Sequence, residues 1–330
     1  MKLTQEINHS ASDLKSIFET YLFEKAFEEF PYVLLQPAMQ IMRMKAKRLR
    51  PILLLTACEA FGGNPETALD AASAVEIYHN FTLVHDDIID KADIRRNEST
   101  VHKKYGINKA ILAGDAMLIH AQQLINTAAA SINNFDLVKT FQKTAMDVIK
   151  GEQMDVDFED LPEVSVEDYL EMSRLKTSVL LAGSLKLGAM IGEASNADLE
   201  KIYDFGMNLG LAFQIKDDYL DSFGDQKTFG KKIGGDILQN KKTYLLCVAL
   251  KKANENTKKE IFNIIEEKDS EKKINEMLAV YEKCDIKEET VKQMETFFNK
   301  SMKSLQEVSL VEKKKEHLLQ LAESIYQRSF

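Results

Sequence analysis

The carboxyl-terminal half of the chain lacks the two residues that most often end helices. Of the five prolines in the 330-residue sequence, none follows Pro162, and no glycine follows Gly235. Within residues 243–266 and 287–326, apolar side chains recur every three or four positions among lysine and glutamate, the spacing of a helix with one buried face. A long stretch without either breaker is typical of helices. Because strand-like alternation is scarce throughout, the sequence predicts an all-α fold.

A hydrophobic content of 45% over 330 residues is enough for a large core, and no linker rich in proline, glycine or serine divides it. We therefore predict one domain over residues 1–330. The three cysteines, Cys58, Cys247 and Cys284, form no disulfide framework or CxxC metal site and indicate reduced side chains. No signal sequence or membrane-spanning run is recognisable, so we expect a soluble protein in the cytoplasm.

Two segments place aspartates among apolar residues with the same spacing: "LVHDDIID" at 83–90 and "DDYLD" at 217–221. Their aspartates are Asp86, Asp87, Asp90, Asp217, Asp218 and Asp221. On a helix, the first and last aspartate of each motif share a face. One such motif is often only the solvated side of an amphipathic helix, but two suggest that they face each other across a cavity. The carboxylates would then repel unless cations lay between them, and oxygen ligands without a Cys/His cluster favour Mg2+.

Basic residues gather at two places in a chain whose formal net charge of −9 disfavours nucleic acid as a partner. They are Arg43, Lys45, Lys47, Arg48 and Arg50 in "RMKAKRLRP", and Arg95 and Arg96 after the first aspartate motif. Such clusters are usually solvated faces, but beside an Mg2+ site they indicate a phosphate-bearing substrate. Apolar helical walls suit a diphosphate with a hydrocarbon tail. No catalytic nucleophile or GxxxxGK[ST] loop is evident, and ionisation of an allylic diphosphate requires neither.

Further motifs follow in order: "KRLRP", "VEIYHNFTLVHDDIIDKADIRR", "STVHKKYGINKAILAGDAML", "LKTS", "FQIKDDYLD" and "FGKKIGGDILQNKKT". Over roughly residues 45–245, this order resembles the trans-isoprenyl diphosphate synthases, also called polyprenyl synthetases. The resemblance implies an isoprenoid-synthase-type helical bundle around a central cavity. It also implies a homodimeric, Mg2+-dependent prenyltransferase that condenses isopentenyl diphosphate with an allylic diphosphate to a short all-trans prenyl diphosphate.

The resemblance assigns roles to individual residues. Asp86, Asp90 and Asp217 would be the principal ligands of about three Mg2+ ions, with Asp87, Asp218 and Asp221 supporting them through waters or from behind. The allylic diphosphate would contact Arg95, Lys176, Lys231 and Lys241. Isopentenyl diphosphate would contact Lys47, Arg50, His79 and Arg96. Thr177 and Gln214, with Lys176, match positions close to the reacting carbon.

Three positions depart from the family pattern. Lys45 and Ala46 replace two glycines before the basic motif, which weakens the expectation of backbone contact with a diphosphate there. Asn97 replaces a glycine after the arginine pair, and asparagine tolerates the left-handed conformation. Glu152 replaces a glutamine and adds negative charge near the expected site.

Phe81 and Thr82 stand five and four residues before Asp86, where a side chain can form the floor for the growing tail. An aromatic residue at the first position only resembles geranylgeranyl diphosphate synthases, with farnesyl diphosphate the next choice. Two other functions stay open: a class I terpene cyclase, which normally lacks the second DDxxD motif and the basic segment, and a catalytically silent partner subunit, which would have lost an aspartate motif. Incubation with Mg2+, isopentenyl diphosphate and allylic starters separates all three.

Overall fold

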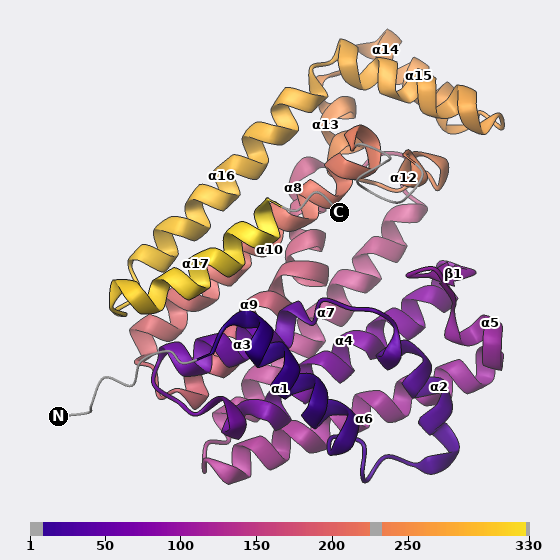
Figure 1. Cartoon of the computed structure of the whole chain (residues 1–330). Coiled ribbons are helices and arrows are strands. Elements are labelled where there is room, and N and C mark those ends of the chain that lie inside the picture. The colour runs from indigo at the N-terminus through magenta and orange to yellow at the C-terminus, as the bar shows by residue number, and fades with distance from the viewer. Residues whose placement is uncertain (1–8, 225–232, 328–330) are drawn as a thin grey trace. The chain divides into compact units, whose positions relative to one another are not determined.

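The computed structural model describes residues 9–224 and 233–327, and helices dominate these ranges (Figure 1). The described strands are β1 (Ile94–Arg95) and β2 (Glu98–Ser99), which pair in one antiparallel hairpin. The predicted all-α fold is therefore confirmed. Among the described helices, none combines the length and the apolar character needed to cross a membrane.

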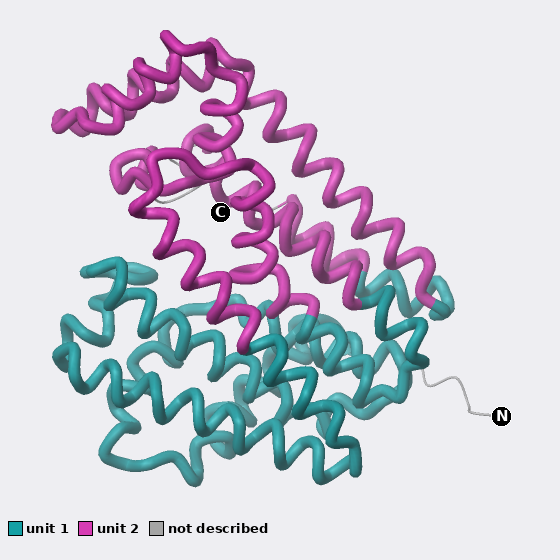
Figure 2. Tube along the Cα trace, turned by 180° about the vertical axis from the view of Figure 1, so that it is seen from behind, with its two compact units in different colours: residues 1–145, 183–202, 309–318 teal, residues 146–182, 203–308, 319–330 magenta. Residues whose placement is uncertain are grey.

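The chain divides into two compact units (Figure 2). Unit 1 contains residues 1–145, 183–202 and 309–318, and unit 2 contains residues 146–182, 203–308 and 319–330. The prediction of one domain stays a prediction.

Unit 1 is built mainly from helices of the first half of the chain. They are α1 (Ala11–Glu24), α2 (Tyr32–Arg43), α3 (Leu49–Ala60), the short η1 (Pro65–Ala68), α4 (Leu69–Ile89), α5 (Val101–Tyr105) and α6 (Ile107–Ser131). Helices α7 (Asp136–Glu159), α9 (Val179–Ile191), α10 (Asn196–Phe223) and α17 (Glu312–Tyr326) have residues in both units.

Helices α4 and α6 pack against each other along the core of unit 1. The approach is close because Gly114 of α6 faces the ring of His85, where an added Cβ would lie 2.2 Å from Nε2. Every residue of α4 from Ala71 to Tyr78 is buried, whereas the end of the helix becomes polar at the aspartate motif. The packing thus fixes α4 by its apolar part and leaves the aspartates at its end.

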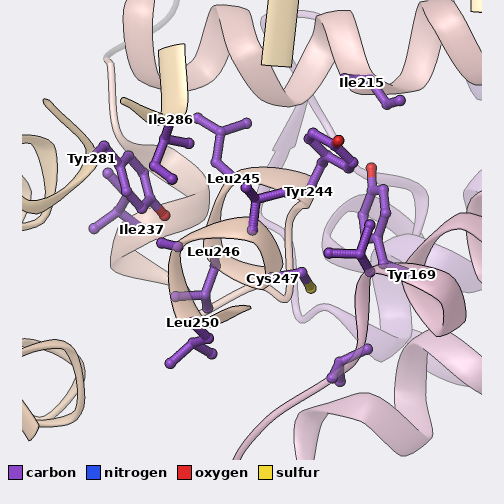
Figure 3. Close-up of a cluster of buried hydrophobic side chains, with 14 of the residues drawn as sticks. Tyr169, Ile215, Ile237, Tyr244, Leu245, Leu246, Cys247, Leu250, Tyr281 and Ile286 are labelled. Carbon is purple, nitrogen blue, oxygen red and sulfur yellow. The ribbon is translucent and has the colours of Figure 1, made fainter. Parts of the chain in front are cut away.

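The core of unit 2 surrounds α13 (Tyr244–Lys252), whose residues from Tyr244 to Leu250 are all buried (Figure 3). A helix that is apolar on every side must be covered all round. The elements that make up the rest of the unit are α8 (Val166–Ser173), the π-helical turn η2 (Arg174–Ser178), α12 (Gly235–Leu238), α14 (Glu255–Ile265), α15 (Ser270–Lys283) and α16 (Ile286–Gln306).

The two carboxyl-terminal segments predicted as helical are helical, but each contains a break. Residues 243–266 form α13 and α14, and residues 287–326 fall in α16 and α17. Asn254 begins α14 by accepting a hydrogen bond from the backbone N–H of Thr257 at 3.0 Å. A side-chain cap of this kind satisfies a free N–H at the start of a helix, so the chain turns there without proline or glycine.

Candidate active site

Helix α4 ends at the first aspartate motif. Asp90 caps the helix, and its backbone N–H donates to the carbonyl oxygen of Asp86 at 2.8 Å. Asp86 is half-buried and Asp90 is exposed. This i, i+4 relation sets both side chains on one face of the helix end, as the spacing predicted.

Asp87, unlike Asp86 and Asp90, has a buried side chain. Arg95 Nε donates to Asp87 Oδ1 at 2.8 Å. Burial raises the pKa of the Asp87 carboxyl, and the positive charge of Arg95 partly opposes that rise. Asp87 therefore holds Arg95 in place, whereas its predicted supporting role at a metal site stays a prediction.

The hairpin that carries Arg95 turns through Arg96 and Asn97, whose φ angles are 52° and 65°. Positive φ at both central residues is what a two-residue type I′ hairpin requires. Asn97 thus accommodates the conformation for which a glycine was expected.

The basic segment is fixed by a buried ion pair at the start of α3. Arg48 has a left-handed backbone (φ 53°), and the residue is only 3% exposed. Its guanidinium donates to Glu76 Oε1 at 2.8 Å and to the carbonyl oxygen of Met42. This anchor sets the backbone between Lys47, before the helix, and Arg50, in its first turn.

His79 of α4 meets that basic segment. Arg50 Nη1 lies 3.1 Å from His79 Nε2, and because arginine only donates, Nε2 accepts and the proton resides on Nδ1. Burial, together with the charges of Arg50, Arg96, Arg95 and Arg48, holds the pKa of His79 well below its usual range. A neutral imidazole surrounded by guanidinium groups makes a region that attracts anions.

The second aspartate motif lies on α10 in unit 2. Asp217 and Asp221 are half-buried and again four residues apart. Asp221 Oδ2 accepts from the backbone N–H of Asp236 at 3.0 Å, and its carbonyl oxygen accepts from the N–H of Gly234 at 2.7 Å. These bonds tie the end of α10 to α12.

Asp218 is buried and accepts hydrogen bonds on both carboxylate oxygens. Oδ2 receives the hydroxyl of Tyr169 at 2.6 Å and the N–H of Tyr244 at 2.8 Å, while Oδ1 receives Gln214 Nε2 at 3.0 Å. Burial raises the pKa of Asp218 to about 6 despite these donors. Gln214 Oε1 in turn accepts from the hydroxyl of Thr177 at 2.8 Å.

Lys176 and Thr177 lie in the π-helical turn η2, an irregularity found at many functional sites. The turn packs directly on α7 at Gly151, where an added Cβ would lie 2.2 Å from the backbone nitrogen of Lys176. Glycine at this position therefore allows the two backbones to meet.

Lys176 forms ion pairs with Glu152 at 2.8 Å and with Asp155 at 2.7 Å. Sequence reasoning identified Glu152 as a departure from the family pattern but missed Asp155. The signal was available, because the two acids are three residues apart on α7 and so share a helix face.

The predicted site residues thus fall into two groups. Unit 1 brings together the first aspartate motif, Arg95 and the basic residues around His79. Unit 2 brings together the second motif, Thr177, Gln214 and Lys176. Lys241 is exposed just beyond α12, and Lys231 lies outside the described residues. That the two motifs face each other stays a prediction.

The donor sets of both motifs fit Mg2+. In the described part of the chain, no three Asp, Glu, His or Cys side chains gather closely enough to hold a metal by themselves. Mg2+ does not need such a cage, because it is commonly bound by one or two carboxylates together with waters and substrate phosphates. A pair of aspartates on one helix face supplies those carboxylates.

Comparison with known proteins identifies the family. The model of the polyprenyl synthetase family matches residues 31–283. The chain belongs to this family. It is 41% identical over 229 residues to the geranylgeranyl diphosphate synthase of Saccharolobus solfataricus, which covers 68% of this chain and 69% of that protein.

Solved structures agree with this membership. The crystal structure of a geranylgeranyl pyrophosphate synthase has a TM-score of 0.91 and 39% identity, and the match covers 98% of this chain and 100% of that one. The synthase from Corynebacterium glutamicum, solved with isoprenyl diphosphate and magnesium, has a TM-score of 0.82 and 25% identity, covering 96% of this chain and 98% of that one.

The hydrogen bond between His79 and Arg50 generates a prediction. Because His79 is neutral and accepts from Arg50, His79→Gln should retain an acceptor for Arg50 and raise the KM for isopentenyl diphosphate only slightly. His79→Ala should raise that KM roughly tenfold or more, since a charge-assisted hydrogen bond is lost. Steady-state kinetics with each substrate varied in turn measures this. Equal KM values for isopentenyl diphosphate in the two variants would show that the hydrogen bond accepted from Arg50 does not matter for binding.

Proposed function

We propose that this polyprenyl synthetase is a short-chain trans-prenyltransferase that condenses isopentenyl diphosphate with an allylic diphosphate, with geranylgeranyl diphosphate as its favoured product. The observation that carries the proposal is the design shared by both aspartate motifs. In each, the first and last carboxylates share a helix face while the middle one is buried against protein donors. The name of the Saccharolobus solfataricus relative supports the choice of product.

In this proposal, isopentenyl diphosphate binds to the basic residues of unit 1. Lys47, Arg50 and Arg96 neutralise its diphosphate, and His79 keeps Arg50 oriented for that contact. Burial, with the charges of the neighbouring arginines, keeps the pKa of His79 low and its imidazole neutral. The diphosphate of isopentenyl diphosphate does not leave during the reaction, so direct contacts with fixed cations are sufficient.

The allylic diphosphate must ionise, and its departing diphosphate must be stabilised. Asp86, Asp90 and Asp217 would hold about three Mg2+ ions, with Asp221 in support, and bound Mg2+ would supply Lewis-acid stabilisation of the leaving group. Arg95, Lys176, Lys231 and Lys241 would contact the same diphosphate. Asp87 orients Arg95 for this contact through its bond to Nε.

The carbon–carbon bond forms when the double bond of isopentenyl diphosphate attacks the allylic cation. A proton then leaves to the released diphosphate. Thr177 and Gln214 would stabilise the positive charge, because both carry oxygen dipoles and are linked at 2.8 Å. The proposal that both aspartate motifs serve one cavity, and the cytoplasmic location, rest on the sequence.

The proposed function predicts strong effects at the principal metal ligands. Asp86→Ala and Asp217→Ala should each reduce turnover roughly a hundredfold or more, while thermal unfolding changes little because a repelling carboxylate is removed. Asp204→Ala serves as the control, since Asp204 is an exposed aspartate on the same helix as Asp217. Incorporation of labelled isopentenyl diphosphate with each allylic starter gives the rates. Near-normal turnover of either variant would reject the ligand assignment.

Product length depends in this proposal on Phe81. Its ring is buried between Tyr78, with ring centroids 5.5 Å apart, and His85, at 4.8 Å. Thr82 donates its hydroxyl to the carbonyl oxygen of His79 at 2.8 Å and offers little bulk. If the tail ends at this ring, Phe81→Ala should lengthen the main product by at least one isoprene unit.

The product of Phe81→Ala is measured by chromatography of the dephosphorylated prenols. Phe18→Ala is the control, because it removes another buried ring of unit 1, on α1 rather than on the helix that carries the aspartate motif. Lengthening in the first variant alone supports the floor at Phe81. An unchanged product distribution places the floor elsewhere.

The homodimer also belongs to the proposal. Helix α6 exposes Ile107, Ile111, Leu112 and Ile119, with exposures between 39% and 61%. At about 100° per residue these side chains lie within about 140° of the helix, on a face that they share with the exposed Asn108 and Asp115. Apolar patches of this kind often mark interaction surfaces, and a second copy is the partner that the resemblance implies.

Sedimentation velocity tests the dimer. The wild-type chain should sediment as a dimer, and Ile119→Glu should shift the population towards monomer because a charge would enter the interface. Val311→Glu, at a residue 62% exposed and outside α6, should leave the dimer intact. A monomeric wild type, or an undisturbed dimer in Ile119→Glu, would contradict the assignment.

A further inference from the structure

A buried tyrosine outside the sequence motifs stands behind the polar pair Thr177–Gln214. Tyr169 of α8 is 2% exposed and donates its hydroxyl to Asp218 Oδ2 at 2.6 Å. Its ring packs edge-on against Tyr244, with centroids 5.8 Å apart (Figure 3). The hydroxyl of Tyr169 is therefore held by packing as well as by its hydrogen bond.

Asp218 determines which end of the Gln214 amide faces it. Tyr169 and the N–H of Tyr244 hold the carboxylate of Asp218 in position, and because an ionised carboxylate only accepts, it takes its third hydrogen bond from the amide nitrogen of Gln214. The amide oxygen must then point away from Asp218. That oxygen is the atom that receives the hydroxyl proton of Thr177.

The direction of these hydrogen bonds determines what the Thr177 hydroxyl can still do. Once its proton is donated to Gln214, the remaining hydrogen-bonding capacity of the Thr177 oxygen is that of an acceptor. A preorganised oxygen with its lone pairs available suits a developing positive charge, whereas a hydroxyl free to turn its proton outward does not.

We propose that Tyr169 is a positioning residue: through Asp218 it fixes the orientation of the Gln214 amide, which in turn directs the oxygen lone pairs of Thr177 towards the reacting carbon. The inference rests on the proposed function. It also gives Asp218 a task other than metal ligation, since both of its oxygens are engaged by protein donors.

Tyr169→Phe tests the proposal, because it removes the hydroxyl and keeps the ring. We expect kcat to fall roughly tenfold to a hundredfold, the range found for residues that orient metal ligands through hydrogen bonds. The KM values of both substrates should stay nearly unchanged. Tyr21→Phe is the matched control, since Tyr21 also donates to a carboxylate, Asp70 Oδ1, at 2.5 Å. Because Tyr21 is only half-buried, this variant should lose no more thermal stability than Tyr169→Phe, and it should keep wild-type kcat.

A double-mutant cycle separates positioning from stability. If Tyr169 acts through Thr177, Tyr169→Phe should reduce kcat little further in a Thr177→Ala background, whereas independent effects would multiply. A wild-type kcat for Tyr169→Phe, or multiplying factors in the cycle, would overturn the proposal. If the wild-type protein does not elongate an allylic diphosphate, the proposed function is contradicted, and this inference with it.

Asp218→Asn provides a second variant that keeps the shape of the side chain. Its carbonyl oxygen can accept from Tyr169 and Tyr244, but its N–H group would face Gln214 and favour the reversed amide. We expect kcat to fall while the Mg2+ concentration that gives half-maximal rate stays constant. A large rise in that concentration would show that Asp218 acts as a metal ligand and would overturn the proposal.

Discussion

Asp218 is a carboxylate inside unit 2, and the elements around it are arranged to satisfy its oxygens. A buried carboxylate without donors is strongly disfavoured, so its burial requires partners. The hydroxyl of Tyr169 comes from α8, the N–H of Tyr244 from the start of α13, and the amide of Gln214 from α10 itself. The same carboxylate thus joins three helices and contacts Gln214, which accepts from Thr177 of η2. In the proposed reaction, packing and chemistry depend on this one set of hydrogen bonds.

In unit 1, the buried charges of Asp87 and Arg48 are satisfied by opposite charges. Asp87 is buried against Arg95, and Arg48 is buried against Glu76, so each internal charge meets an opposite one. Replacing one member of such a pair would leave an uncompensated charge inside the protein. These pairs hold the hairpin and the start of α3, which carry Arg96, Lys47 and Arg50. The buried pairs thus fix the position of the residues proposed to bind the substrate.

The sequence predicted the parts of this design that depend on local spacing. The i, i+4 relation set Asp86 with Asp90 and Asp217 with Asp221 on common helix faces, and breaker-free segments became helices. Spacing could not tell that the middle aspartates turn inward, because that depends on partners far along the chain, such as Tyr169 for Asp218. Nor could it locate the helix start at Asn254, where a polar cap replaces the usual breakers.

In the proposed reaction the two diphosphates have different fates, and the charges around the residues proposed to bind them fit that difference. Around His79, arginines outnumber acids, which suits a diphosphate that remains attached to its carbon throughout. In unit 2, Lys176 is shared between Glu152 and Asp155, so the local charge is negative even before Asp217 and Asp221 are counted. A surface of that sign repels a bare diphosphate and accepts one that arrives with divalent cations. The substrate whose diphosphate must leave is the one that benefits from cations, because they stabilise the charge that grows on the departing group.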